Sequence, residues 1–140
     1  MSELFAAQLR EHGVERSAAT ILSALEAISA QPEHGFVLAA MNDGTPVGVA
    51  YAVCILSLEH GGWSGWLEEL YVVPEWRGCG VGSELLSAVV AAADARDWMA
   101  LDLEVDAGHQ RVIPLYARHG FEPVPRSRFV RRRPREAATP

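Results

Sequence analysis

Hydrophobic side chains recur every three or four positions in three long segments of the chain, which is the spacing of an amphipathic helix. The predicted helices cover residues 2–11, 15–30 and 83–96. A shorter helix is predicted over residues 111–119, where Pro114 is tolerated only close to a helix start. We therefore expect this last helix to begin late or to be kinked.

Strand patterns fill the middle of the chain. Residues 36–41 and 46–56 are rich in β-branched and apolar side chains, and Asn42-Asp43-Gly44 between them is a typical hairpin turn. A further strand is predicted over residues 63–73.

The remaining strands are shorter. Leucine and valine alternate with acidic residues over 101–105, which predicts a strand that is polar on one face, and strands are also expected at 121–124 and 129–132. Strands and helices mix along the chain, so the predicted fold class is α/β with a mixed α+β sheet. At 140 residues one domain is expected, here residues 1–133 followed by a loose tail, residues 134–140.

The composition changes this picture little. Hydrophobic residues make up 49% of the chain, as in a compact globule, and no apolar run is long enough for a membrane span. The acidic start resembles no export signal, and two cysteines, Cys54 and Cys79, do not make a disulfide framework. We expect a cytoplasmic protein with no membrane partner.

Charge is unevenly distributed. The net charge is −6, the chain contains no lysine, and half of its arginines lie in the last fifteen positions. An arginine-rich C-terminus of this kind is also typical of arms that bind nucleic acid. We interpret the arginines instead as the solvated face of a last strand followed by a loose tail, so no nucleic-acid partner is expected. The residues concerned are Arg126, Arg128, Arg131, Arg132, Arg133 and Arg135.

The most informative stretch joins the strand that ends at Pro74 to the helix that begins near Ser83. Its sequence, Arg77-Gly-Cys-Gly-Val-Gly-Ser83, places glycines at alternate positions where a helix starts. Exposed backbone N–H groups and the positive end of the helix dipole make such a turn a binding site for phosphate. The glycine spacing differs from that of dinucleotide-binding folds, and a P-loop would need a lysine.

What does match is R-x-x-G-x-G after a V-x-P strand end. This pattern resembles the acetyl-CoA-binding motif of the GNAT superfamily of N-acetyltransferases. A second motif, L-Y-x-x-x-G-F, resembles the segment that carries the general-acid tyrosine in that family, which places this role on Tyr116. The resemblance implies a central, mostly antiparallel, splayed sheet flanked by helices. It also implies acetyl-CoA as co-substrate, direct transfer to an amine, and no metal.

The resemblance further implies the residues that bind acetyl-CoA. The thioester carbonyl would meet a backbone N–H near Val72, in a strand that splays from its neighbour. The predicted cofactor-binding residues are Leu70, Tyr71, Val72, Arg77, Gly78, Cys79, Gly80, Val81, Gly82, Ser83 and His109.

The chain also departs from the family pattern. Helix comes first, so the usual first strand is missing and the strand over residues 36–41 should lie at an edge of the sheet. Edge strands invite pairing, which makes this edge the expected docking place for a second subunit in a homodimer. His109 stands where many relatives carry asparagine.

Acyl transfer to an amine requires a base, because an alkyl ammonium has a pKa of about 10.4. Glu68 and Glu69 precede the phosphate turn on the central strand, and strand alternation suggests that only one of them faces the cleft. The resemblance favours Glu68 as base, with Glu69 binding substrate charge. A water chain, His60 or His109 are the alternatives.

The acceptor is predicted from weaker signals. The motif is most similar to the branch that acetylates small amines and polyamines. Glu59, Trp63 and Trp66 would suit a cationic amine through charge and cation–π contact. Peptide amino termini remain an alternative acceptor, and a CoA-binding regulatory module without catalysis is an alternative of another class.

Overall fold

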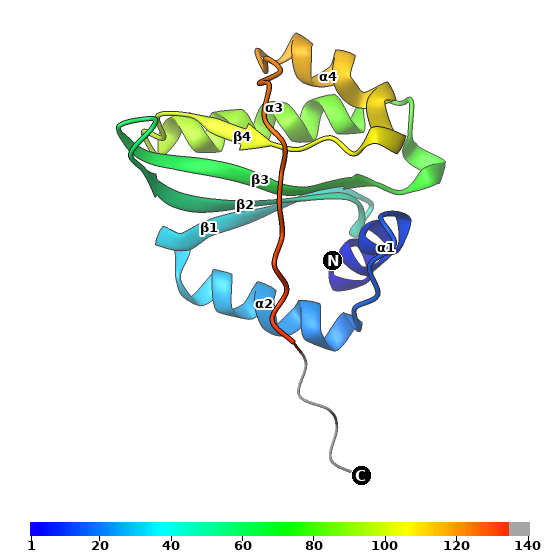
Figure 1. Ribbon diagram of the computed structural model, residues 1–140. Coiled ribbons are helices and arrows are strands. Elements are labelled where there is room, and N and C mark those ends of the chain that lie inside the picture. The colour runs from blue at the N-terminus through cyan, green and yellow to red at the C-terminus, as the bar shows by residue number, and fades with distance from the viewer. Residues whose placement is uncertain (135–140) are drawn as a thin grey trace.

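The computed structural model describes residues 1–134 (Figure 1). A mixed sheet with strand order β1-β2-β3-β4 forms its centre. Strands β1 (Gly35–Asn42), β2 (Thr45–Ser57) and β3 (Gly62–Val72) pair antiparallel, and the short β4 (Leu101–Leu103) is parallel to β3. The predicted α/β architecture is confirmed, and β1 is an edge strand as expected.

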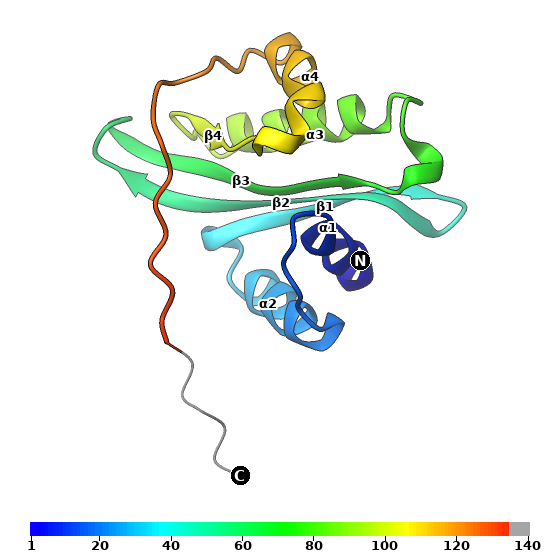
Figure 2. The ribbon, with the colours of Figure 1, turned by 45° about the vertical axis from the view of Figure 1, so that its right-hand side comes forward.

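Helices cover both faces of this sheet (Figure 2). Helices α1 (Ser2–Glu11) and α2 (Ala18–Ala30) lie on one side, and α3 (Val81–Ala95) and α4 (Ile113–Arg118) lie on the other. Short 3-10 segments lie between these elements: η1 (Pro32–His34), η2 (Pro74–Trp76) and η3 (Ala107–Val112), the last of which is kinked at His109. Among the described residues, no helix is long and apolar enough to cross a membrane.

Each face of the sheet has its own core. On the α3 side, Leu86 and Val89 are fully buried against Ala50 and Leu67. On the α1 side, Phe5 packs with Val49 and Tyr71. Apolar burial on both faces is the main stabilising term of this arrangement.

Local residues explain most element boundaries. Ser17 caps α2 by accepting a hydrogen bond from the Thr20 N–H at 3.1 Å, so this helix begins at Ala18 and not at residue 15 as predicted. Asp43 and Gly44 both have positive φ angles, 47° and 77°, as a tight hairpin turn requires. Pro114 lies in the first turn of α4, which therefore begins late, as expected.

Strand β4 is shorter than predicted, since Val105 lies outside it. It pairs with β3 only from the pair Gly65–Leu101 to the pair Leu67–Leu103, after which the chain turns into η3. Among the described residues, the rest of β3 therefore has no strand partner on its β4 side. This is the splay that the sequence resemblance predicts.

The two strands predicted at 121–124 and 129–132 are wrong. Residues 119–134 form no strand, and the part of them after Pro125 runs across the strand direction in both views, so it makes no hydrogen-bonded ladder with the sheet (Figures 1 and 2). Phe129 is 93% exposed. Ion pairs hold this segment instead, from Arg126 to Glu59 at 2.8 Å and from Arg128 to Glu104 at 2.9 Å. The predicted tail, residues 134–140, lies outside the described residues from 135 onward.

Candidate active site

A cavity of about 920 Å³ opens where β3 and β4 diverge. Its walls come from α1, the unpaired end of β3, the turn before α3, η3 and α4, and Arg128, Val130 and Arg132 of the segment after α4 also line it. The sheet splay thus produces a pocket with exposed backbone on one side and two helix termini at its rim.

The glycine-rich turn forms one end of this cavity. Gly78 and Gly80 have φ angles of 76° and 87°, in the left-handed region that favours glycine. Gly80 is the N-cap of α3, and no side chain there accepts a hydrogen bond from the helix. The first backbone N–H groups of a 15-residue helix consequently have no capping partner, which leaves them available to an anion.

Most of the predicted cofactor-binding residues line the same cavity. Two do not. Cys79 is exposed on the outside of the turn, and the Val81 side chain lies close to Gly48 of β2, on the sheet side of α3. Those that line it are Leu70, Tyr71, Val72, Arg77, Gly78, Gly80, Gly82, Ser83 and His109.

Arg77 is engaged within the protein. Its Nε donates to the Val72 carbonyl at 2.9 Å, and its guanidinium donates to Glu11 at 2.8 Å. The hydrogen bond to Glu11 raises the pKa of Arg77. The Arg77 side chain therefore ties the phosphate turn to the end of β3 and to α1. An anion at this turn would meet the backbone N–H groups more directly than the guanidinium of Arg77, which is already engaged within the protein.

Both candidate bases face the cavity, because a β-bulge interrupts strand alternation. Tyr51 pairs with Glu69 and Ala52 pairs with Leu67, so Glu68 is the extra residue. Leu67 and Leu70 both reach the α3-side core across it. The expectation that only one of the glutamates faces the cleft is wrong for this reason.

The two glutamates differ in environment. Glu68 is exposed, whereas Glu69 is half-buried. Burial, followed by repulsion from Glu68, raises the pKa of Glu69 to about 7, although His12 and a hydrogen bond to Gln8 oppose this. Glu69 is therefore poised to exchange a proton near neutral pH, as a general base must be.

Tyr116 projects from α4 into the same cavity. Its ring packs edge-on against Phe121 with centroids 5.7 Å apart. Burial and the negative charge of Glu69 raise the pKa of Tyr116, so its hydroxyl stays protonated at neutral pH and is able to donate. The carboxylate and the phenol are thus electrostatically coupled across one pocket.

His119, which the sequence patterns did not single out, fixes the helix that carries Tyr116. Its Nδ1 donates to the Leu115 carbonyl at 2.9 Å, which leaves Nε2 to accept from the Ser87 hydroxyl at 3.1 Å. The tautomer is assigned from these partners. The C-cap residue of α4 is thereby anchored to α3, three residues after the cavity-lining Tyr116.

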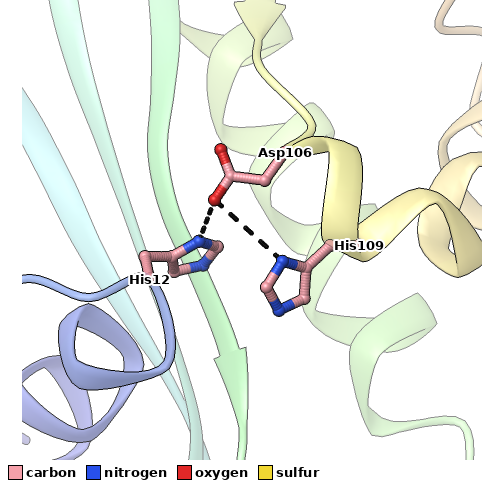
Figure 3. A group of neighbouring side chains, drawn as sticks. All are labelled: His12, Asp106 and His109. Carbon is pink, nitrogen blue, oxygen red and sulfur yellow. Dashed lines mark hydrogen bonds and ion pairs between the residues drawn. The ribbon is translucent and has the colours of Figure 1, made fainter.

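A second group that the sequence did not reveal lies at the cavity wall. His12, in the turn after α1, contacts Asp106 through its Nδ1, and His109 lies next to both (Figure 3). Residues 12 and 106 are far apart in the chain and belong to no motif, so only the fold brings them together.

Several acceptor candidates lie elsewhere. Glu59 and Trp63 are exposed at the far end of the β2–β3 hairpin and do not line the cavity, while Trp66 does. His60, an alternative base, pairs with Asp102 at 2.9 Å outside the cavity.

Comparison with protein families identifies one match. The model described as "Acetyltransferase (GNAT) family" covers residues 1–121, which include the glycine-rich turn, both glutamates and Tyr116. No curated protein sequence matches the chain significantly.

Solved structures share the fold. An integron cassette protein from the mobile metagenome of Cole Harbour Salt Marsh is 24% identical, with a TM-score of 0.80 over 99% of this chain and 83% of that one. A "predicted acetyltransferase with acetyl-CoA" from Clostridium acetobutylicum is 18% identical, with a TM-score of 0.76 over 93% and 86% of the two chains. An aminoglycoside antibiotic 6'-N-acetyltransferase from Acinetobacter haemolyticus is 18% identical, with a TM-score of 0.69 over 84% and 83%.

Proposed function

The chain belongs to the GNAT family of acetyl-CoA-dependent acetyltransferases, and from that premise we propose that it acetylates a primary amine of a small, cationic molecule. Transfer is direct, without a covalent enzyme intermediate. The exposed position of Cys79, outside the cavity, supports direct transfer because the cavity lining includes no thiol.

The residues present fit acetyl-CoA. The uncapped start of α3 and the turn Gly78–Gly80 would hold the pyrophosphate, and the unpaired backbone of Leu70 to Val72 would hold the pantetheine arm. The thioester supplies the activated acetyl group. A backbone N–H of this strand segment would stabilise the oxyanion that forms during transfer.

We assign the base to Glu69 and not to Glu68, the residue that the sequence resemblance favoured. Glu69 is the half-buried member of the pair, and its pKa of about 7 suits proton removal from an ammonium at neutral pH. Around it lie Glu68 on the same strand, Gln8 and His12 from the α1 side, and Asp106 before η3.

Glu68 then binds the positive charge of the acceptor. It is exposed within the cavity beside the base, and it takes part in no ion pair among the described residues. The cavity lining carries five acidic residues and five arginines, so cation preference rests on this local carboxylate and not on an acidic pocket as a whole.

Tyr116 is the proton donor for the departing thiolate. A phenol, with an ordinary pKa of about 10, is a weaker acid than a thiol, at about 8.5, so Tyr116 donates its proton to the sulfur as the C–S bond breaks and charge builds up there, and the phenolate then regains a proton from water. The observation that carries the whole proposal is that Glu69 and Tyr116 face one cavity, which also receives the uncapped start of α3.

Release of free thiol from acetyl-CoA, measured with a polyamine, an amino acid and a peptide with a free amino terminus, tests this proposal. We expect turnover with the polyamine, and a much slower rate in Tyr116→Phe. Turnover with peptides alone would overturn the small-amine acceptor and leave acetyl transfer intact. Binding of acetyl-CoA without turnover across a broad amine panel would overturn the assigned chemistry.

A further inference from the structure

The cluster of His12, Asp106 and His109 has the composition of a divalent-metal site. It combines two imidazoles and one carboxylate, the donor set that zinc and its neighbours in the first transition row accept. The Nδ1 atoms of both histidines point to the same carboxylate oxygen (Figure 3). The ligands come from two distant parts of the chain, the end of α1 and the start of η3.

The spacing is close to what a metal requires. One ligand atom from each residue lies within 4.8 Å of the others, and the distance from His109 Nδ1 to Asp106 Oδ2 is 4.0 Å. Ligands of tetrahedral zinc, with bonds of about 2.05 Å, are roughly 3.4 Å apart. Small side-chain rotations would therefore complete the arrangement without moving the backbone.

His109 adds an independent observation. Its Nδ1 is buried, yet among the described residues it has no hydrogen-bond partner. A buried imidazole nitrogen without a partner is unfavourable in a protein that binds nothing there. The atom faces Asp106 and His12, where a bound cation would satisfy it.

An ion pair between His12 and Asp106 alone explains only part of this geometry. It accounts for the contact of these two residues, but it leaves the His109 nitrogen without a partner while the rings of His12 and His109, tilted by 41°, lie with centroids only 4.6 Å apart. A cation bound by both imidazole rings and by the Asp106 carboxylate explains this arrangement better than the ion pair alone.

We propose that His12, Asp106 and His109 bind a Zn²⁺-like divalent cation that ties the end of α1 to η3. Because all three residues line the cavity of the acetyltransferase site, the bound metal closes one wall of it. Three protein ligands leave a fourth coordination position for water or for a donor group of a small molecule in the cavity. This site does not depend on the identity of the acceptor or of the base.

Calorimetric titration of tag-free protein with ZnCl₂ tests the site without any measurement of acetyl transfer. The protein carries Cys79→Ser throughout, since the exposed thiol is itself a zinc ligand. We expect one Zn²⁺ per chain. His12→Gln, Asp106→Asn and His109→Gln should each weaken binding by more than about tenfold, because losing a ligand exceeds the usual effect of losing a group around one.

His34→Gln is the matched control, since His34 is exposed on η1 and outside the cluster. It should bind zinc as the parent protein does, and zinc should raise the Tm of both. In the unmutated cluster, histidine NMR resonances of His12 and His109 should shift on addition of zinc, which requires no variant to fold. Equal affinity in the parent and the three cluster variants, or shifts confined to other histidines, would overturn the proposal.

Discussion

Replacing Glu69 with glutamine should stabilise the protein at alkaline pH while it abolishes the proposed base. The folded state holds the pKa of Glu69 at about 7, against an ordinary value of 4.5. Below about pH 4.5 the carboxyl is protonated in both states and lowers the free energy of unfolding very little. As pH rises from 4.5 through 7, the unfolded state ionises first and the free energy of unfolding falls, because the folded state must then bury a charge.

The magnitude follows from the size of the shift. A shift from 4.5 to about 7 corresponds to at most about 3 kcal/mol, and screening by water in the open cavity reduces this to on the order of 1–2 kcal/mol. For a chain of this length, we expect Glu69→Gln to raise Tm at pH 8.5 by roughly 3–6 °C. At pH 4, where most of the carboxyl is protonated in both states, the Tm values should nearly coincide.

Differential scanning calorimetry across pH 4 to 9 measures this, with Glu26→Gln, an exposed carboxyl on α2, as the control, because Glu68 itself raises the pKa of Glu69. The same preparations give the pH profile of kcat/KM. Wild-type activity should rise with an apparent pKa near 7, and Glu69→Gln should lose that limb. A Glu69→Gln protein that is no more stable than wild type at pH 8.5 would refute the reasoning, since Glu69 would then carry no buried charge.

Three further outcomes are expected. Gly80→Val should weaken acetyl-CoA binding in calorimetry. The control Gly44→Val should not, because Gly44 has a similar φ angle and equal open space but lies in the β1–β2 hairpin turn. Equal acetyl-CoA affinity in both variants would show that the pyrophosphate does not bind at the glycine-rich turn. Tyr116→Phe should lower kcat by about 10²- to 10⁴-fold with little change in acetyl-CoA affinity, and an unchanged kcat under rate-limiting chemistry would leave the ring as packing only. Light scattering should detect a homodimer through the exposed edge of β1, and a lysine introduced at Met41, an exposed hydrophobic residue of that strand, should weaken it.

Much of this fold is readable from local pattern. Helix α1 follows from its amphipathic repeat, and the β1–β2 hairpin follows from Asn42-Asp43-Gly44, because both depend on residues close in sequence. The glycine-rich turn is equally local, since its positive φ angles and its uncapped helix start depend on residues 78–81.

What the sequence could not predict depends on distant pairing. The bulge at Glu68 arises from the register of β3 against β2, so strand alternation misjudged which glutamates reach the cavity. The apolar pair Phe129-Val130 suggested a strand, but this segment crosses the sheet and pairs with no strand among the described residues. His12 and Asp106 meet only because α1 packs beside the splayed end of β3.

A crystal structure of the protein with CoA and an acetylated polyamine tests the central claim most directly. The account predicts the pyrophosphate on the backbone N–H groups between Gly78 and Ser83, and the pantetheine arm against Leu70 to Val72. The sulfur should lie within hydrogen-bond reach of Tyr116, and the product amide nitrogen should lie on the Glu69 side of the cavity. CoA bound outside the splay of β3 and β4, or a sulfur remote from Tyr116, would contradict it.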